Sequence, residues 1–239
     1  ELRKSFILIG DRANGKSTYL DMIKTLLGPA NVCALDLKEL GDRFKTALIA
    51  GRLANIGDDI GSEFIPDPAI FKKLVSGDPV NAERKGQDPF DFTPYAKLLF
   101  SANDIPRIKD KSGAVLSRLV IVPFDATFSK NDPDFDPYIK YKLRRRESME
   151  YLILLGIEGL KRVLKNSSFT TSKRVVKQLE EYEENNNPIL QFFKEKTIDD
   201  FENQPTRDVF QDYSGFCHGN GFTPLRTWSS ENSSRNVSD

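Results

Sequence analysis

The chain has 239 residues, enough for one large domain or for one domain with a small second one. Its 38% hydrophobic and 29% charged residues suit a soluble globular protein. Lysine and arginine together number 35, as do aspartate and glutamate, so any nucleic-acid site must be a local patch or an assembled surface. Cys33 and Cys217 are too few for a disulfide scaffold and fit a reducing, intracellular setting. The sequence has no signal peptide and no run long enough to span a membrane, so we expect no membrane partner.

The first predicted element is a buried strand over the apolar, β-prone residues 5–9. Residues 10–17 follow it and fit the pattern G-x-x-x-x-G-K-[ST], the phosphate-binding loop of nucleoside triphosphatases. A helix is predicted from Ser17 to Leu27, where Gly28 and a proline stop it. We therefore predict that ATP is bound by the loop and the start of the helix, through Gly10, Asp11, Arg12, Ala13, Asn14, Gly15, Lys16, Ser17 and Thr18.

The residue types in this loop explain the chemistry. Gly10 and Gly15 let the backbone fold tightly around a phosphate, where a side chain would block the approach. The amide groups of the loop and of the helix N-terminus face the anion. Lys16 can reach the terminal phosphates, and Ser17 can offer its hydroxyl to Mg²⁺.

Strands and helices alternate along the middle of the chain, which predicts an α/β fold with a mainly parallel central sheet. A helix from Lys38 to Gly51 is expected to place Leu40, Phe44 and Leu48 on one side. The other expected elements are strands over 32–35, 52–57, 96–102 and 119–124, a helix over 68–75, and a hairpin with arms at 79–83 and 90–92.

From Ser148 the pattern becomes helical, with a second charged helix over 175–184 and a linker over 183–188. Two short helical patterns lie between Ile189 and Gly221. The last residues, 229–239, are rich in Ser and Asn and are expected to be disordered. We therefore predict an ATPase domain with a helical tail over residues 1–185 and a small second segment over residues 186–239.

Two adjacent carboxylates, Asp58 and Asp59, follow a predicted strand at a distance that suits the second acidic motif of these ATPases. Asp58 could hold Mg²⁺, directly or through water. Asp59 could orient or deprotonate the attacking water. An exposed acidic turn is the alternative, and the phosphate loop favours the functional interpretation.

Two further residues are catalytic candidates. Asn103 ends the strand over 96–102, where an amide can touch the γ-phosphate and the attacking water; an Asn-Asp turn is the alternative. Arg118 precedes the strand over 119–124 and suits an arginine finger, a guanidinium that stabilises transition-state charge, often from a neighbouring subunit. Arg107 competes for this role, and a surface arginine packed on the sheet is the other alternative.

The predicted hairpin carries Arg84 and Lys85, which could grip a nucleic-acid backbone. Two charges give weak affinity, but six copies around a pore would multiply the contacts. A solvated turn explains the local sequence equally well.

Taken together, these motifs make the chain similar to superfamily 3 helicases. The closest resemblance is to the carboxy-terminal helicase part of the phage and plasmid primase–helicase family, which is related to the poxvirus primase–helicases. The likeness is carried, in this order, by residues 10–18, 54–59, 71–80, 96–106 and 117–124.

The resemblance implies an AAA-like P-loop ATPase that uses ATP and Mg²⁺, forms a hexameric ring and moves along single-stranded or forked DNA. It assigns Lys16, Asp58 and Asp59 to catalysis, Asn103 to a γ-phosphate sensor and Arg118 to the finger. It also implies a pore hairpin around Arg84 and Lys85, and a winged-helix-like segment after Ile189, here cut short.

The resemblance also sets expectations for the setting. A primase domain would lie upstream of this chain, so we expect the chain itself not to prime. The protein would act in the cytoplasm of a bacterial host, as a phage, prophage or plasmid protein. Two other functions stay open: a P-loop small-molecule kinase, and a nucleotide-dependent DNA-binding or assembly module without unwinding activity.

Overall fold

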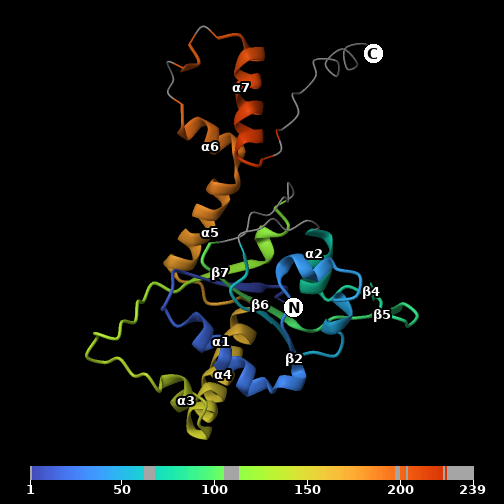
Figure 1. Ribbon diagram of the computed structural model, residues 1–239, viewed down its shortest axis with the longest axis vertical. Helices are drawn as coiled ribbons and strands as arrows, with labels where there is room; N and C mark the ends of the chain where they lie inside the picture. Colours follow the sequence, from blue (N-terminus) through green and yellow to red (C-terminus); the bar gives the residue numbers. More distant parts are fainter. Residues whose placement is uncertain are drawn as a thin grey trace. The chain divides into compact units, whose positions relative to one another are not determined.

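A computed structural model describes residues 2–61, 68–104, 113–196, 200–202, 204–222 and 224 (Figure 1). The chain divides into two compact units, Glu1–Tyr182 and Glu183–Asp239. None of the helices in these described ranges is long and apolar enough to cross a membrane.

The first unit is built on a sheet of five strands, all paired in parallel. Their order across the sheet is β2-β3-β6-β1-β7, so β6 lies between β1 and β3. The predicted α/β class with a parallel sheet is confirmed. The strands are β1 (Ser5–Ile9), β2 (Val32–Cys33), β3 (Ala54–Gly57), β6 (Lys97–Ala102) and β7 (Leu119–Pro123).

Both faces of this sheet are covered, as a parallel sheet requires. Successive side chains of a strand point to opposite faces, and the fully buried Ile7 and the nearly buried Leu8 accordingly belong to different clusters. Leu8 packs with Leu20 of α1 (Lys16–Leu27). Ile7 shares the larger cluster with Phe71 of α2 (Pro68–Ser76), and Figure 1 shows α1 and α2 on opposite sides of the sheet.

The predicted hairpin is confirmed as a small antiparallel sheet of β4 (Val80–Ala82) and β5 (Phe90–Phe92). Val80 and Ala82 are buried, whereas residues 84–89 of the connecting turn are exposed.

The single helix predicted over residues 38–51 is wrong. Two short 3-10 helices replace it, η2 (Leu37–Gly41) and η3 (Thr46–Ile49), and Phe44 and Leu48 are exposed. The break falls at Asp42, whose backbone is extended, with a ψ of 131°. The Asp42 carboxylate accepts from the Phe44 amide at 3.2 Å, and the Thr46 hydroxyl donates to the Leu40 carbonyl at 2.6 Å. Such bonds offer the backbone an alternative to a continuous helix.

Three helices follow β7 in the first unit: α3 (Ile139–Leu143), α4 (Arg146–Asn166) and α5 (Lys173–Asn186), of which α4 and α5 confirm the helical tail. Tyr182 of α5 is only 5% exposed and joins the main core. By contrast, none of the 21 residues of α4 is buried. An exposed apolar stripe runs along α4 at helical spacing and is formed by Ile153, Ile157, Leu160 and Leu164.

The second unit contains α6 (Pro188–Lys194) and α7 (Thr206–Gly219), which confirm the two short helical patterns. Phe192, Tyr213 and Cys217 form its buried cluster. The predicted linker over 183–188 begins at the boundary between the two units, but it is largely helical. Helix α5 continues to Asn186, and the Asn187 side chain caps α6. The described part of this unit has no strand, and the winged-helix-like segment stays a prediction. Residues 229–239 lie outside the described residues.

Candidate active site

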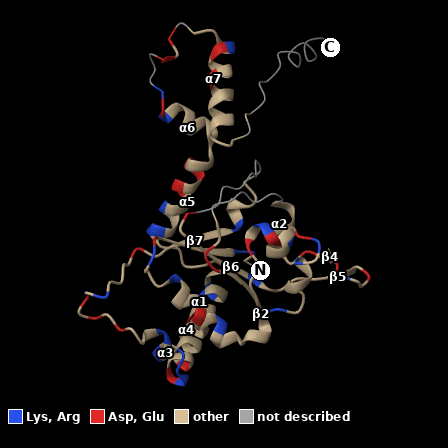
Figure 2. Cartoon of the chain, viewed as in Figure 1, with Lys and Arg blue, Asp and Glu red and all other residues tan. Residues whose placement is uncertain are grey.

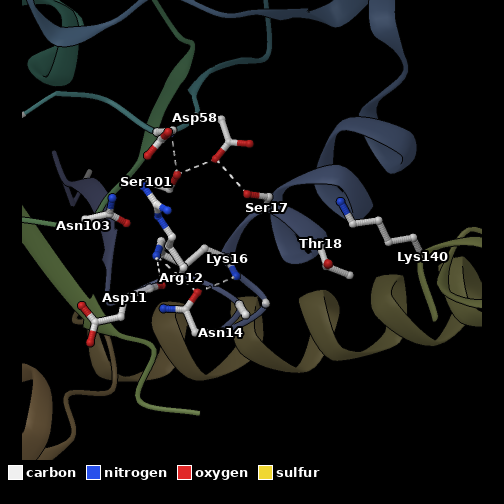
Figure 3. A pocket seen from close by; sticks show the side chains of 13 residues that line it. Asp11, Arg12, Asn14, Lys16, Ser17, Thr18, Asp58, Ser101, Asn103 and Lys140 are labelled. Carbon is white, nitrogen blue, oxygen red and sulfur yellow. Dashed lines mark hydrogen bonds between the residues drawn. The ribbon is translucent and has the colours of Figure 1, made fainter. Parts of the chain in front are cut away.

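Three adjacent parallel strands deliver polar side chains to one edge of the sheet. The phosphate loop follows β1, the acidic pair follows β3, and Asn103 follows β6. Their ends surround a cavity of about 380 Å³ (Figure 3). The cavity is lined by Asp11, Arg12, Ala13, Asn14, Gly15, Lys16, Ser17, Thr18, Asp58, Asp59, Ser101, Asn103 and Lys140.

The loop has the backbone geometry that a phosphate cradle needs. Gly10 and Gly15 have φ angles of 147° and 92°, in a region that favours glycine, and Ala13 has a φ of 58°. A Cβ on Gly10 would lie 2.4 Å from the Phe124 carbonyl oxygen and 2.4 Å from Asn14 Nδ2. The two glycines of the sequence pattern are therefore required by conformation and, at Gly10, also by space.

The buried Asn14 side chain fixes the loop to the segment after β7. Its Nδ2 donates to the Phe124 carbonyl at 3.0 Å, while its Oδ1 accepts from Lys16 Nζ at 3.2 Å. The Phe128 amide donates to the Ala13 carbonyl at 2.8 Å from the same segment. These contacts hold the shape of the loop from outside the cavity.

Lys16 is only 7% exposed, and its ammonium group hydrogen-bonds to the loop itself. Its partners are the carbonyls of Gly10 and of Asp11, the latter at 2.9 Å, and Asn14 Oδ1. All three are uncharged oxygens, so a phosphate oxygen can replace them with a stronger, charge-assisted partner.

Ser17 and Asp58 are in contact at the N-terminus of α1. The Ser17 hydroxyl donates to Asp58 Oδ1 at 3.3 Å, which brings together two oxygen groups of the kind that Mg²⁺ binds (Figure 3). This chemistry fits the predicted metal ligands, a hydroxyl and a carboxylate held beside a phosphate loop.

Ser101 of β6 organises the acidic pair, and sequence reasoning missed it. Its hydroxyl donates to Asp58 Oδ1 and accepts from the Asp59 amide at 2.9 Å. The Ser101 carbonyl accepts from the Ile60 amide at 2.8 Å. With 1% exposure, Ser101 is a polar residue inside an apolar strand, and that anomaly is the signal that could have found it.

The chain turns sharply at Asp59, whose φ is 55°. Successive side chains of an extended strand point to opposite faces, so a straight continuation of β3 would separate the two carboxylates. The left-handed turn, which Asp tolerates better than most residues, lets Asp58 and Asp59 line the same cavity.

Arg118 lies at the opposite edge of the sheet. Leu119 pairs with Ser5 at the start of β7 and β1, whereas the phosphate loop begins where both strands end. Arg118 is therefore separated from the start of the phosphate loop by about six strand residues, or roughly 20 Å at ~3.3 Å per residue. The Arg118 guanidinium donates to the Ala114 carbonyl at 2.7 Å and to the Ser76 hydroxyl at 3.2 Å. Its rival Arg107 lies outside the described residues.

The hairpin residues do not line the cavity. Arg84 and Lys85 are exposed in the turn between β4 and β5, where the Gln87 amide donates to the Arg84 carbonyl at 3.0 Å. The Arg84 guanidinium lies over the Phe90 ring, 4.5 Å from its centre. This stacking orders Arg84 and leaves Lys85 at the tip.

The Cys33 thiol of β2 is not a reactive nucleophile. Burial raises the pKa of the Cys33 thiol to about 11, so Cys33 stays protonated at neutral pH. Its Sγ lies 3.3 Å from Asn55 Oδ1.

Comparison with known proteins gives one family match and several viral relatives. Residues 8–118 match the model of a family described as a family of unknown function, DUF5906. The chain is 30% identical over 142 residues to "Putative helicase 184R" of Invertebrate iridescent virus 6, and 29% identical over 130 residues to "Putative helicase 121R" of Invertebrate iridescent virus 3. The matches cover 54% and 50% of this chain, but only 14% of each viral protein.

Among solved structures, the chain resembles the A form apo structure of the NrS-1 C-terminal region. The TM-score is 0.51 and the sequence identity is 11%, over 62% of this chain and 34% of the other. At this identity the likeness concerns the fold, and it supports the α/β architecture described above.

The position of Ser101 predicts the effect of removing its hydroxyl. Ser101→Ala should weaken binding of Mg²⁺-nucleotide by roughly 10-fold, since hydrogen bonds to charged groups contribute about 1.5–3 kcal/mol. Isothermal titration calorimetry measures this loss directly.

The matched control is Ser5→Ala. Ser5 is also a buried serine of the sheet, and its hydroxyl donates to the Leu98 carbonyl at 3.0 Å, away from the cavity. Equal nucleotide affinity in the two variants would show that Ser101 has no role beyond packing.

Proposed function

We propose that this chain is the ATPase part of an ATP-dependent DNA helicase or translocase. The single observation that carries the proposal is the cavity itself, on which Lys16, Ser17, Asp58 and Asn103 converge from three adjacent strands. The viral relatives named as helicases favour this function, and their likeness supports a helicase-like family. The chain matches only a small part of those proteins, so the activity of the whole is proposed and not transferred.

ATP and Mg²⁺ are the proposed cofactors, and the residues fit both. The glycine cradle and Lys16 would hold the phosphates, while the Ser17 hydroxyl and Asp58 would hold Mg²⁺. When bound, Mg²⁺ neutralises charge that develops on the phosphates. We assign to Asp59, whose amide is anchored by Ser101, the role of taking a proton from water. Asn103 is proposed to orient that water and the γ-phosphate.

Two alternatives are less well supported. A small-molecule kinase would share the loop, but the sequence relatives favour a helicase. A module that keeps nucleotide only for assembly would not need the acidic pair and Asn103 around the phosphate site, and all three line the cavity.

Arg118 is proposed to act on the site of a neighbouring copy of the chain. It lies about 20 Å along the strands from its own phosphate loop, farther than an arginine side chain reaches. In the proposed AAA-like hexamer, a head-to-tail ring would bring the carboxyl edge of one sheet to the amino edge of the next.

The hairpin formed by β4 and β5 is proposed to bind DNA. The exposed turn carries Arg84 and Lys85, and a ring would repeat these two charges in every subunit. We also propose, from the family resemblance, that the protein serves phage or plasmid replication in a bacterial cytoplasm, and that priming belongs to an upstream primase domain.

Hydrolysis tests the core of the proposal. Lys16→Ala should abolish ATP hydrolysis and weaken nucleotide binding, since the main phosphate cation is lost. Asp59→Asn should bind Mg-ATP normally and lose turnover, because its carboxylate acts on water. A coupled phosphate-release assay with and without single-stranded DNA measures both. Near-normal turnover in Asp59→Asn would move the role to Asp58, or to Glu63, which lies outside the described residues.

Subunit mixing tests the trans role of Arg118. Arg118→Ala should keep nucleotide affinity and lose turnover by ~10³-fold, the scale of an arginine finger. Mixing it with Lys16→Ala protein should restore some activity, because a mixed interface can join one intact loop to one intact finger.

Ser76→Ala is the control for a merely structural role, because it removes the hydroxyl that Arg118 contacts within its own chain. This variant should remain active. A loss equal to that of Arg118→Ala, or no rescue in rings shown to be mixed, would refute the trans role.

The hairpin is tested by Arg84→Ala/Lys85→Ala. This variant should keep basal ATPase activity, lose its stimulation by DNA, and show a flatter salt dependence of DNA binding because fewer phosphates are neutralised. Lys161→Ala/Arg162→Ala, an equally charged exposed pair on α4, is the matched control. Equal affinities and equal salt slopes in titrations of labelled single-stranded DNA would mean that the turn is only solvated surface.

A further inference from the structure

A basic run from Lys140 to Arg146 connects α3 to α4 and is visible as blue segments beside α3 in Figure 2. Most of its charges have carboxylate partners nearby. Lys142 pairs with Asp136 at 2.6 Å, and Arg146 pairs with Glu150 at 2.7 Å. Neither of these two pairs lines the phosphate cavity, so their charges are balanced within the segment itself. Lys140 differs from them.

Lys140 is the member of the run that lines the phosphate cavity. Figure 3 shows its ammonium group beyond Thr18, on the side of the cavity away from Asn103. The sequence pattern of the loop does not include this lysine, because it arrives from a helix more than a hundred residues later in the chain.

The present partner of Lys140 holds it weakly. Its Nζ lies 3.8 Å from Asp21 Oδ2 on α1, too far for a hydrogen bond. Arg144 Nη2 lies 3.5 Å from the same oxygen, so Asp21 keeps a cationic neighbour if Lys140 turns away. The Lys140 side chain is 53% exposed, which leaves it room to move.

The charged side chains that line the cavity are of both signs. Lys16 and Arg12 are the loop's own cations, and three carboxylates, Asp11, Asp58 and Asp59, line the same space. Lys140 adds a third positive charge, on the side of the cavity away from Asn103. Asp21, the carboxylate partner of Lys140, is not among the described residues that line the cavity.

We propose that Lys140 is a nucleotide-binding residue that grips the α-phosphate of the nucleotide held by the loop. The inference rests on the proposed function and adds a residue to its site. In the proposed function Asn103 marks the γ-phosphate end of the cavity, and Lys140 lies on the side away from Asn103, near Thr18. A contact there is made equally to ATP and ADP, because both carry the α-phosphate.

The test compares Lys140→Ala with Lys142→Ala in titrations of the whole chain with Mg-ATP and Mg-ADP. Lys142 lies on the same helix, has the same 53% side-chain exposure and has its own carboxylate partner away from the cavity. We expect Lys140→Ala to weaken the binding of ATP and of ADP by the same factor, about 5- to 10-fold. This loss lies between the contribution of an exposed ion pair and that of a hydrogen bond to a charged group. Lys142→Ala should match the wild type.

Two further measurements separate nucleotide binding from a structural role. Turnover at saturating ATP should stay within about twofold of the wild type in Lys140→Ala, since the contact is the same in the ground and transition states. Lys140→Arg should recover most of the affinity, because it keeps the charge. Thermal melting of both alanine variants should coincide.

The outcomes are distinct. If the wild type binds nucleotide and Lys140→Ala binds it with the same affinity, this inference is overturned and the proposed function stays intact. A loss for ATP alone would place Lys140 at the γ-phosphate and refute the α-phosphate contact. A wild-type chain that binds neither nucleotide would overturn the proposed function, and this inference with it.

Discussion

The site depends on the position of one strand, β6, which pairs in parallel with β1 on one side and with β3 on the other. Parallel pairing aligns the carboxyl ends of the three strands, and the loop, the acidic pair and Asn103 therefore share one edge. Ser101 reinforces this alignment, because its hydroxyl joins β6 by hydrogen bonds to both residues of the acidic pair. An antiparallel or displaced β6 would leave the same residues without a common cavity.

Much of this arrangement could be predicted from the sequence, because strong local signals carry it. The apolar run before Gly10, the glycine pattern and the strand before Asp58 depend on nearby residues alone. For Ser101 the sequence offers only a polar residue inside an apolar strand, and for Lys140 it offers no local signal. Their contacts arise from pairing across the sheet and from packing of α3 near α1. The helix expected over residues 38–51 failed for the opposite reason: its apolar spacing was right for a helix, but the Asp42 side chain bonds to the Phe44 amide, which the spacing does not reveal.

The two edges of the sheet are chemically different, and this asymmetry gives the molecule a direction. The carboxyl edge holds the loop, its cations and the acidic pair. The amino edge holds Arg118, fixed by contacts from α2 and from the turn before β7. In the proposed function the carboxyl edge receives an anion and the amino edge presents a cation, and a single subunit cannot bring its own two edges together.

The exposed stripe on α4 affects the solubility of the protein. Leu160 and Leu164 are 56% and 72% exposed, so water contacts most of their apolar surface. Each costs roughly 1 kcal/mol of unfavourable hydration at about 25 cal/mol per Å², and hydrophobic contact between molecules removes that cost. Replacing these leucines by glutamine or lysine would raise solubility with little loss of folding stability, whereas the same change at the buried Leu20 would unfold the sheet. The helix therefore offers a simple route to a sample concentrated enough for crystallisation.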